Sequence, residues 1–323
     1  MILSLTSSER DAYIMNHLPI KQIEKEKYGE VFTHPEFIRK IFDLFPRDVY
    51  SNPQLKWIDP TAGVGNFIII LYELLMNGLT NWEPDEEKRS NHIIENMLYM
   101  NELSQTNCDI AKTIFGDKAN ITCADFLSEK CPLTNKFDCI IGNLPFQHNY
   151  GKTSTGARIL GGKNKLYEQI FLKACDILNP NGFLSFIVPD AIFSGNNNAS
   201  YNILLQNSVP FISFNSSNQK YFPKIQQTIC YFIMKKTGRT ETIIENNNEI
   251  FTTTLQNRII NPIQNWNSHT DTLIDKYVST KRNCVIYNRG KNLSAYNGSL
   301  YPLIYTHTKT LYTDNELLAR GLH

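Results

Sequence analysis

The sequence predicts an α/β protein built on a doubly wound, largely parallel sheet, and three observations carry this prediction. Apolar strand-like runs alternate with amphipathic helical patterns between residues 56 and 234. Several of these runs stop abruptly at an acidic residue or in a glycine- or proline-containing loop. The chain has 323 residues, 41% of them hydrophobic, which is enough for one large core. In such a sheet the carboxyl ends of the strands form one edge, where ligands bind.

The first elements are helical. Ser7 or Ser8 is expected to cap a helix that continues from residue 10 to residue 17. An extended segment then ends at Thr33, a good N-cap residue, and Pro35 begins an amphipathic helix.

The alternating part follows. Strands are expected at 56–59, 97–101, 120–123, 137–142, 183–188, 209–214 and 228–234. Helices are expected at 67–76, between Ser104 and Gly116, and at 166–178. The turn signature at 179–182 separates the last of these helices from the fifth strand.

The fourth strand is the most informative one. Its β-branched run ends at Gly142 and continues into a polar loop that contains Pro145. This loop offers the side-chain amide of Asn143, the backbone carbonyl of Leu144 and the aromatic face of Phe146. Such a set suits the binding of a flat ring that carries an amino group.

The loops after the first three strands add a nucleoside-binding pattern. Asp59 precedes a turn with two glycines that has neither the G-x-G-x-x-G spacing nor a Gly-Lys-Ser/Thr ending. Glu102 ends the second strand, where an acid accepts hydrogen bonds from both ribose hydroxyls in nucleoside-binding sheets. Asp125 follows the third strand.

Composition bears on the setting and the partner of the protein, and we expect an intracellular protein because no membrane span and no secretory pattern are found. The formal net charge is +1, but from Leu205 onward 13 Lys and Arg stand against 7 Asp and Glu, which suits a tail that faces a polyanion. No segment approaches the roughly 20 apolar residues of a membrane span. The N-terminus lacks a secretory pattern. The 7 cysteines contain no C-x-x-C pair, so disulfides and a metal site are not expected.

Two of these motifs resemble those of a known family. The segments 59–67 and 143–146 resemble the cofactor and catalytic motifs of S-adenosylmethionine-dependent DNA adenine-N6 methyltransferases. The segment 32–35 resembles the motif that precedes the cofactor strand in the gamma order of that family, and the turn at 222–228 resembles its base-stacking segment. The resemblance covers about residues 28–236 and implies a Rossmann-like, seven-stranded methyltransferase sheet.

The resemblance also implies roles for single residues. It implies S-adenosylmethionine as cofactor, bound by Phe32, Thr33, Asp59, Ala62, Gly63, Gly65, Glu102, Asp125, Phe126 and Asn143. It implies a catalytic loop of Asn143, Leu144, Pro145 and Phe146, in which the Asn143 side chain and the Leu144 carbonyl accept hydrogen bonds from adenine N6. It implies that Phe146 and Phe222 stack on a base extruded from double-stranded DNA.

The implied organisation has two parts. Residues 1–240 form the methyltransferase domain, with 1–27 as a helical extension, and residues 241–323 form a small C-terminal module for target recognition. The loop at 148–163 is expected to help read the target. The expected setting is a DNA-associated modification enzyme of a restriction-modification system, without a nuclease in this chain.

Several alternatives stay open at this stage. Leu144 departs from the proline that is usual in DNA adenine enzymes, and Asn-Leu-Pro-aromatic is also the pattern of ribosomal RNA adenine dimethyltransferases. A non-catalytic DNA-binding subunit and a protein-glutamine methyltransferase are further options. Phe146 and Phe222 could be core aromatics, and Glu102 and Asp125 could cap helices. The recognition sequence and the oligomeric state are not predicted.

Overall fold

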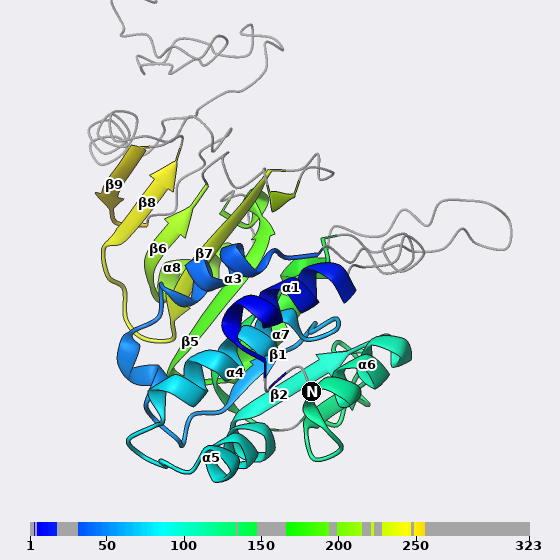
Figure 1. Cartoon of the computed structure of the whole chain (residues 1–323). Coiled ribbons are helices and arrows are strands. Elements are labelled where there is room, and N and C mark those ends of the chain that lie inside the picture. The colour runs from blue at the N-terminus through cyan, green and yellow to red at the C-terminus, as the bar shows by residue number, and fades with distance from the viewer. Residues whose placement is uncertain are drawn as a thin grey trace, which may run out of the picture.

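In this computed structural model the described residues are 3, 5–17, 32–133, 135–146, 166–193, 199–214, 221–222, 228–246 and 249–255 (Figure 1). The expected target-reading loop at 148–163 lies outside these ranges. So do residues 223–227 of the expected base-stacking turn and residues 256–323 of the expected C-terminal module. All three assignments therefore stay predictions for these residues.

Within the described ranges, one sheet of nine strands forms the centre of the protein. The strands are β1 (Trp57–Asp59), β2 (Leu98–Glu102), β3 (Asn120–Cys123), β4 (Phe137–Asn143), β5 (Leu178–Pro189), β6 (Ser208–Ser213), β7 (Ile229–Lys235), β8 (Thr242–Asn246) and β9 (Glu249–Thr253). Their order is β3-β2-β1-β4-β5-β7-β6-β8-β9. The strands β1 to β5 pair in parallel, and β7 is antiparallel to both of its neighbours.

The doubly wound methyltransferase sheet predicted from the sequence is confirmed, but it has two more strands than the seven expected. β8 pairs in parallel with β6, and β9 pairs antiparallel with β8. Both strands lie after residue 240, where the C-terminal module was expected to begin. This part of the chain continues the same sheet instead of starting a separate one.

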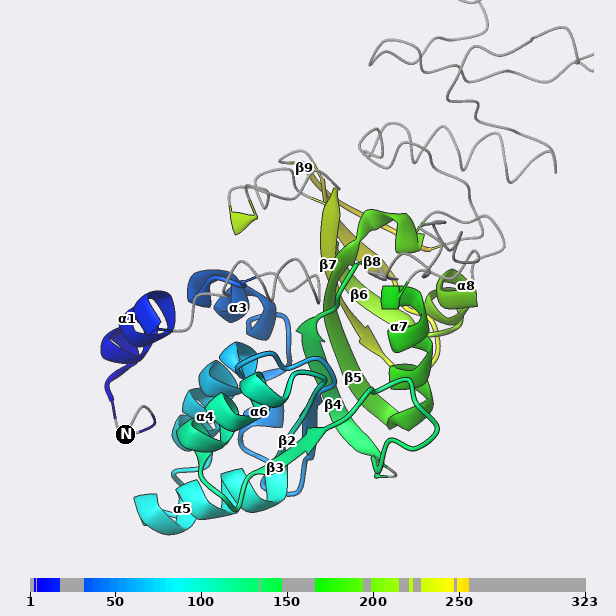
Figure 2. The ribbon, with the colours of Figure 1, turned by 90° about the vertical axis from the view of Figure 1, so that its right-hand side faces the viewer.

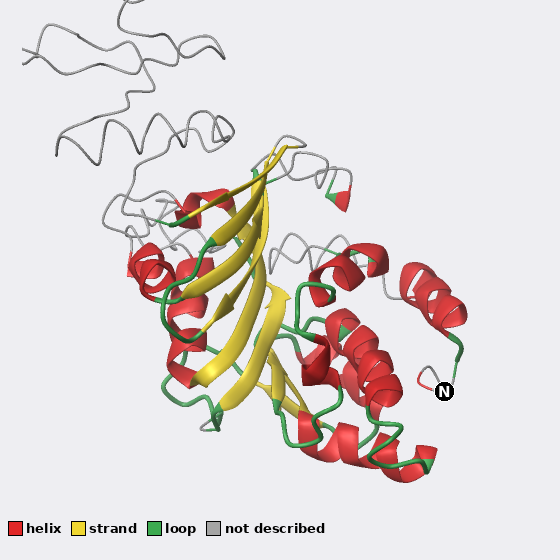
Figure 3. Ribbon diagram, turned by 90° about the vertical axis from the view of Figure 1, so that its left-hand side faces the viewer, coloured by secondary structure: helices red, strands yellow, loops and turns green. Residues whose placement is uncertain are grey.

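Helices cover both faces of the sheet (Figures 2 and 3). They are α1 (Ser7–His17), α3 (Pro35–Phe42), α4 (Asn66–Gly78), α5 (Glu86–His92), α6 (Gln105–Phe115), α7 (Leu166–Ile177) and α8 (Ala199–Gln206), with short turns η2 (Arg47–Tyr50), η3 (Ile93–Met97) and η4 (Asp190–Phe193). One hydrophobic cluster lies beneath α3, α4, η3 and α6, and a second lies beneath α7, α8 and η4. In the described part of the chain, no helix is long and apolar enough to cross a membrane.

The strand β4 shows why the sheet needs both helical layers. Cys139 and Ile141 belong to the first cluster, whereas Phe137 and Ile140 belong to the second. All four side chains are fully buried. A strand that is apolar on both faces is typical of a parallel sheet between two helical layers, which explains its uninterrupted apolar sequence.

Two local predictions need correction. The N-cap of α3 is His34, whose Nδ1 accepts a hydrogen bond from the Glu36 backbone N–H, because the following proline holds His34 extended. Thr33 therefore lies outside the helix. The strand β5 begins at Leu178, so the expected turn at 179–182 lies within it, at an irregularity where Asn181 has a φ of 63°.

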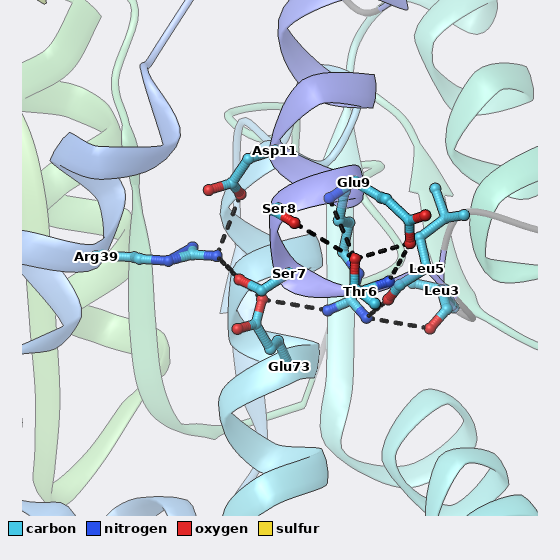
Figure 4. Close-up of polar contacts among 10 residues, drawn as sticks. Leu3, Leu5, Thr6, Ser7, Ser8, Glu9, Asp11, Arg39 and Glu73 are labelled. Carbon is cyan, nitrogen blue, oxygen red and sulfur yellow. Dashed lines mark hydrogen bonds and ion pairs between the residues drawn. The ribbon is translucent and has the colours of Figure 1, made fainter.

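The N-terminal helix α1 is held on α3 and α4 by a small ionic cluster (Figure 4). The Glu73 carboxylate of α4 accepts from Arg10 of α1 at 3.2 Å and from Arg39 of α3 at 3.1 Å. Arg39 also bonds to Asp11 and to the Ser7 hydroxyl of α1. Arg10 is only 7% exposed, so removal of its anionic partner would leave a poorly hydrated charge and cost more than the loss of a surface pair.

We expect Glu73→Gln to weaken the docking of α1. Two guanidinium groups would lose their shared anionic partner in a partly buried site, at a cost of about 1–3 kcal/mol. Urea unfolding and hydrogen exchange of the α1 amides measure this loss.

The matched control is Asp43→Asn, which breaks the exposed Arg47–Asp43 pair. It should change stability by no more than about 0.5 kcal/mol. Equal effects of the two substitutions would contradict the assignment of the Glu73 cluster as the clamp of α1.

Candidate active site

The carboxyl group at the end of β1 is buried in the middle of the sheet edge. Asp59 is 2% exposed, and its Oδ1 accepts a hydrogen bond from the Thr61 backbone N–H at 2.9 Å. Burial raises the pKa of this carboxyl from 3.8 to about 8, the Thr61 hydrogen bond opposes that rise, and the nearby Glu102 charge adds to it. A carboxyl in such surroundings favours a cationic partner.

The glycine turn after β1 requires glycine for its backbone shape. Gly63 and Gly65 have φ values of 56° and 94°, a region that side chains other than glycine rarely adopt. Gly65 is the N-cap of α4. A Cβ built on Gly63 would meet nothing within 4 Å, so the turn is open on that side.

Glu102 closes the other side of this turn. Its Oε2 accepts from the Gly63 backbone N–H and its Oε1 from the Ser104 backbone N–H, both at 2.8 Å. Burial raises the pKa of this carboxyl, while these hydrogen bonds lower it. Glu102 thus caps the start of α6, as one alternative proposed, and it also holds the glycine turn. The two roles are compatible with one another.

Asn101, immediately before this acid, was not selected from the sequence. It is 2% exposed, and its Nδ2 donates to the backbone carbonyls of Pro60 and Ala124. The backbone carbonyl of Asn101 accepts a hydrogen bond from the Ala62 backbone N–H at 2.9 Å. Asn101, which lies within β2, therefore joins the loops that follow β1 and β3. The sequence feature that could have identified Asn101 was its polar amide within a largely apolar strand.

The loop after β3 contains the next two expected cofactor residues. Asp125 is exposed, and its Oδ1 accepts from the Leu127 backbone N–H at 2.9 Å in a local turn. Phe126 is 4% exposed and belongs to the second hydrophobic cluster, with the Lys173 ammonium 5.1 Å from its ring centroid. Asp125 is accessible to a ligand, whereas Phe126 packs mainly beneath the loop.

The loop after β4 lies beside Asp59 and is held from two sides. Leu144 is buried, and its N–H donates to the Ile187 carbonyl of β5. The Asn143 side chain is half-buried, and its Nδ2 donates to Thr33 Oγ1 at 3.0 Å. Pro145 and Phe146 are also half-buried, and Phe146 packs against the first cluster.

Gly142 is the position that lets β4 pass the buried carboxyl. Its φ is 153°, and a Cβ built on it would lie 2.7 Å from Asp59 Oδ1. A side chain at this position would therefore strain the backbone and collide with a group that the sheet edge is built around. Gly142 was predicted only as the end of a strand, and its contact with Asp59 was not predicted.

The expected cofactor residues before α3 are placed close to the same edge. Thr33 is 4% exposed, and Phe32 is half-buried against the first cluster. The structure thus brings Thr33 and Asn143 into direct contact although they are 110 residues apart in the chain.

The second expected stacking residue packs against the helix α3. Phe222 is 2% exposed, and its ring packs edge-on against Phe37 with the centroids 5.4 Å apart. The neighbouring Tyr221 donates its hydroxyl to Glu36 at 2.7 Å, and its ring lies 4.9 Å from that of Phe37. Phe222 is therefore a core aromatic in this conformation, as the alternative interpretation proposed.

A known protein family matches part of this chain. Residues 67–222 match the family described as Eco57I restriction-modification methylase. This match covers 156 of the 323 residues, just under half of the chain. The matched segment begins in α4 and ends at Phe222, so it includes the loops after β2, β3 and β4. The Asp59 turn and Thr33 lie before it.

Relatives of this chain carry similar descriptions. An uncharacterized adenine-specific methylase of Mycoplasma pneumoniae is 27% identical over 307 residues, which cover 70% of this chain and 71% of the relative. The type II methyltransferase M.VspI of Vibrio sp. strain 343 is 30% identical over 181 residues, which cover 55% of this chain and 40% of that protein. The chain thus spans less than half of the second relative.

Solved structures support the fold of this chain. A modification subunit of a putative type I restriction enzyme from Vibrio vulnificus aligns with a TM-score of 0.52 at 14% identity, covering 86% of this chain and 59% of that one. The protein of a DrdV–DNA complex aligns with a TM-score of 0.55 at 14% identity, covering 78% and 33%. At these identities the likeness concerns the fold alone.

A metal site is not expected from the cysteine pattern of the sequence. In the ranges that the structure describes, no group of three or more His, Cys, Asp or Glu side chains is arranged to hold a metal ion.

We expect Gly142→Ala to disturb the site and the stability together. The added Cβ would displace the Asp59 carboxyl and impose an unfavourable backbone conformation, at a cost of about 1–3 kcal/mol. Urea unfolding measures the loss of stability, and titration with S-adenosylmethionine measures the loss of affinity.

Gly238→Ala is the matched control, because a Cβ at that exposed position meets nothing within 4 Å. It should leave stability and affinity within twofold of the parent values. A Gly142→Ala protein that behaves like this control would show that the close approach to Asp59 is not required.

Proposed function

We propose that this chain transfers a methyl group from S-adenosylmethionine to the N6 amino group of adenine in double-stranded DNA. The observation that supports this most strongly is the placement of Asn143 and the Leu144 backbone next to the buried Asp59 and the Glu102-bound glycine turn. The site thus pairs acceptors for an amino group with a buried carboxyl and a glycine turn that suit a cationic nucleoside. The family match at residues 67–222 and the adenine-specific description of one relative support adenine as the methyl acceptor.

The residues at the sheet edge fit such a cofactor. The Asp59 carboxyl would face the positively charged methionine end. Glu102 would exchange the Gly63 N–H for ribose hydroxyls, which the open space next to Gly63 allows. Asp125, which is exposed, would bond to the adenine amino group. The cofactor supplies an electrophilic methyl on a sulfonium.

The catalytic loop would prepare the acceptor nitrogen. The N6 lone pair of adenine is delocalised into the ring, so the nitrogen is a poor nucleophile. Two oxygen acceptors on its hydrogens, Asn143 Oδ1 and the Leu144 carbonyl, favour a pyramidal nitrogen with an available lone pair. Alignment of the two reactants supplies most of the acceleration, since effective molarity can contribute on the order of 7–11 kcal/mol. No general base is required.

Access to the amino group requires that the base leave the duplex. Extrusion costs a few kcal/mol, and stacking on aromatic rings returns about 1–3 kcal/mol. Phe146 is half-buried and available for this contact. Phe222 would have to leave its edge-on position against Phe37, which loses an aromatic contact of about 0.5–1.5 kcal/mol.

RNA is the second candidate substrate. The observation that favours it is the leucine at position 144, because Asn-Leu-Pro-aromatic is also the pattern of ribosomal RNA adenine dimethyltransferases. Leu144 is buried in the second hydrophobic cluster, and the group that it would contribute to the reaction is its backbone carbonyl. This carbonyl is the same whether the residue is leucine or proline. The assay below separates the two polymers.

Asn143→Ala tests the proposed reaction. The substitution removes one of two acceptors for N6, and we expect methyl transfer to fall by at least a hundredfold while the cofactor still binds. The assay incubates the protein with labelled S-adenosylmethionine and duplex DNA, single-stranded DNA, RNA or protein. Digestion then identifies the methylated species.

Labelled N6-methyladenine from duplex DNA supports the proposal. Label in RNA or in protein alone would replace it with one of the alternatives, and full activity of the Asn143→Ala protein would overturn the assignment of the catalytic loop.

Cofactor binding should release a proton near pH 7. With a pKa of about 8, the cofactor-free Asp59 carboxyl is mostly protonated at pH 7, and a cation beside it lowers that pKa. Affinity should therefore rise with pH by up to about tenfold per unit and level off above pH 8. Calorimetry in buffers of different ionisation enthalpy counts the protons.

The control is Asp59→Asn, which cannot titrate and should bind the cofactor weakly without proton release. Binding of the parent protein at pH 7 with no exchange of protons would contradict a protonated Asp59.

A further inference from the structure

The Asn143 amide is held by a residue from a distant part of the chain. Asn143 Nδ2 donates to Thr33 Oγ1 at 3.0 Å. An asparagine side chain has two ends of similar shape, an oxygen that only accepts and an NH₂ that only donates. Whatever bonds the NH₂ therefore decides where the oxygen points.

Thr33 is suited to this task because its own position is rigid. It is 4% exposed and immediately precedes His34, which caps α3. The apolar face of α3 is buried in the first hydrophobic cluster, with Phe37 and Ile38 fully covered. The hydroxyl thus belongs to a buried residue that directly precedes the N-cap of a packed helix.

The orientation of the amide matters for the proposed chemistry. An N6 amino group donates its hydrogens, so it needs the oxygen of Asn143. With the amide turned by half a rotation, an NH₂ group would face another NH₂ group, and one of the two acceptors would be lost. We propose that Thr33 is a positioning residue that fixes the acceptor end of Asn143 toward the amino group to be methylated. This inference rests on the proposed function.

Thr33→Val tests the proposal at saturating cofactor and DNA. Valine keeps the shape and removes the hydroxyl, and we expect kcat to fall about tenfold, which corresponds to about 1.4 kcal/mol. Thr33→Ser, which restores a hydroxyl, should recover most of that loss. Thr113→Val on the surface of α6 is the matched control, because it removes a threonine hydroxyl remote from the site.

A measurement without turnover examines the contact directly. In cofactor-free protein labelled with ¹⁵N-asparagine, the Asn143 NH₂ signal is identified by its disappearance in the Asn143→Asp protein. Its exchange with water should be slow in the parent and in Thr33→Ser, and several-fold faster in Thr33→Val. A purely cofactor-binding role for Thr33 would leave this exchange rate unchanged.

A double substitution separates orientation from general support. The carboxylate of Asn143→Asp has two equivalent oxygens, so it has no wrong orientation. Thr33→Val should then change kcat by less than about twofold in the Asn143→Asp background, against about tenfold in the parent. If the Asn143→Asp protein is too slow to assay, the serine rescue and the exchange rates decide.

The proposal is overturned if Thr33→Val raises only the KM for S-adenosylmethionine, with kcat and amide exchange unchanged. It is also overturned if serine fails to restore turnover while the fold is intact. The activity of the parent protein distinguishes a failure of the proposed function from a failure of the proposed role of Thr33. A parent that methylates no adenine refutes the proposed function, whereas normal turnover of Thr33→Val in an active parent refutes only the role of Thr33.

Discussion

A carboxyl group buried between parallel strands is the constraint around which the sheet edge is arranged. Asp59 sits at the end of the central strand β1, and its desolvation raises its pKa to about 8. The cost of this burial is offset by the Thr61 N–H and tolerated only because β4 has no side chain at Gly142. The protein maintains an unfavourable group at the place where a cation would relieve it, which is a common property of binding sites.

The helix α3 connects the parts of the site that the sheet does not hold. Thr33, which accepts a hydrogen bond from the Asn143 amide, immediately precedes the N-cap of this helix. The first turn of the helix carries Glu36 and Phe37, and the segment of Tyr221 and Phe222 packs on these two residues. A short amphipathic helix thus contacts both the amino-group site and the aromatic segment. Its packing has to satisfy two requirements, which explains why its buried face is entirely aromatic or β-branched after Pro35.

The strands and their polar ends could be predicted from the sequence because their signals are local. Asp59, Glu102 and Asn143 each interrupt an apolar run, and parallel pairing then brings them to one edge. The contact of Gly142 with Asp59 could not be predicted in this way, since it depends on the register between β1 and β4. The strands β8 and β9 were missed because their short, partly polar sequences become strands only by pairing with β6 and with each other.

The clamp of α1 has a consequence for how substitutions combine. Arg10 and Arg39 share one acceptor, the Glu73 carboxylate, and each guanidinium repels the other across it. Removal of either arginine would let the carboxylate bond more favourably to the one that is left. The two losses are therefore coupled, and the docking of the N-terminal helix is a three-body interaction whose energy cannot be divided between two ion pairs.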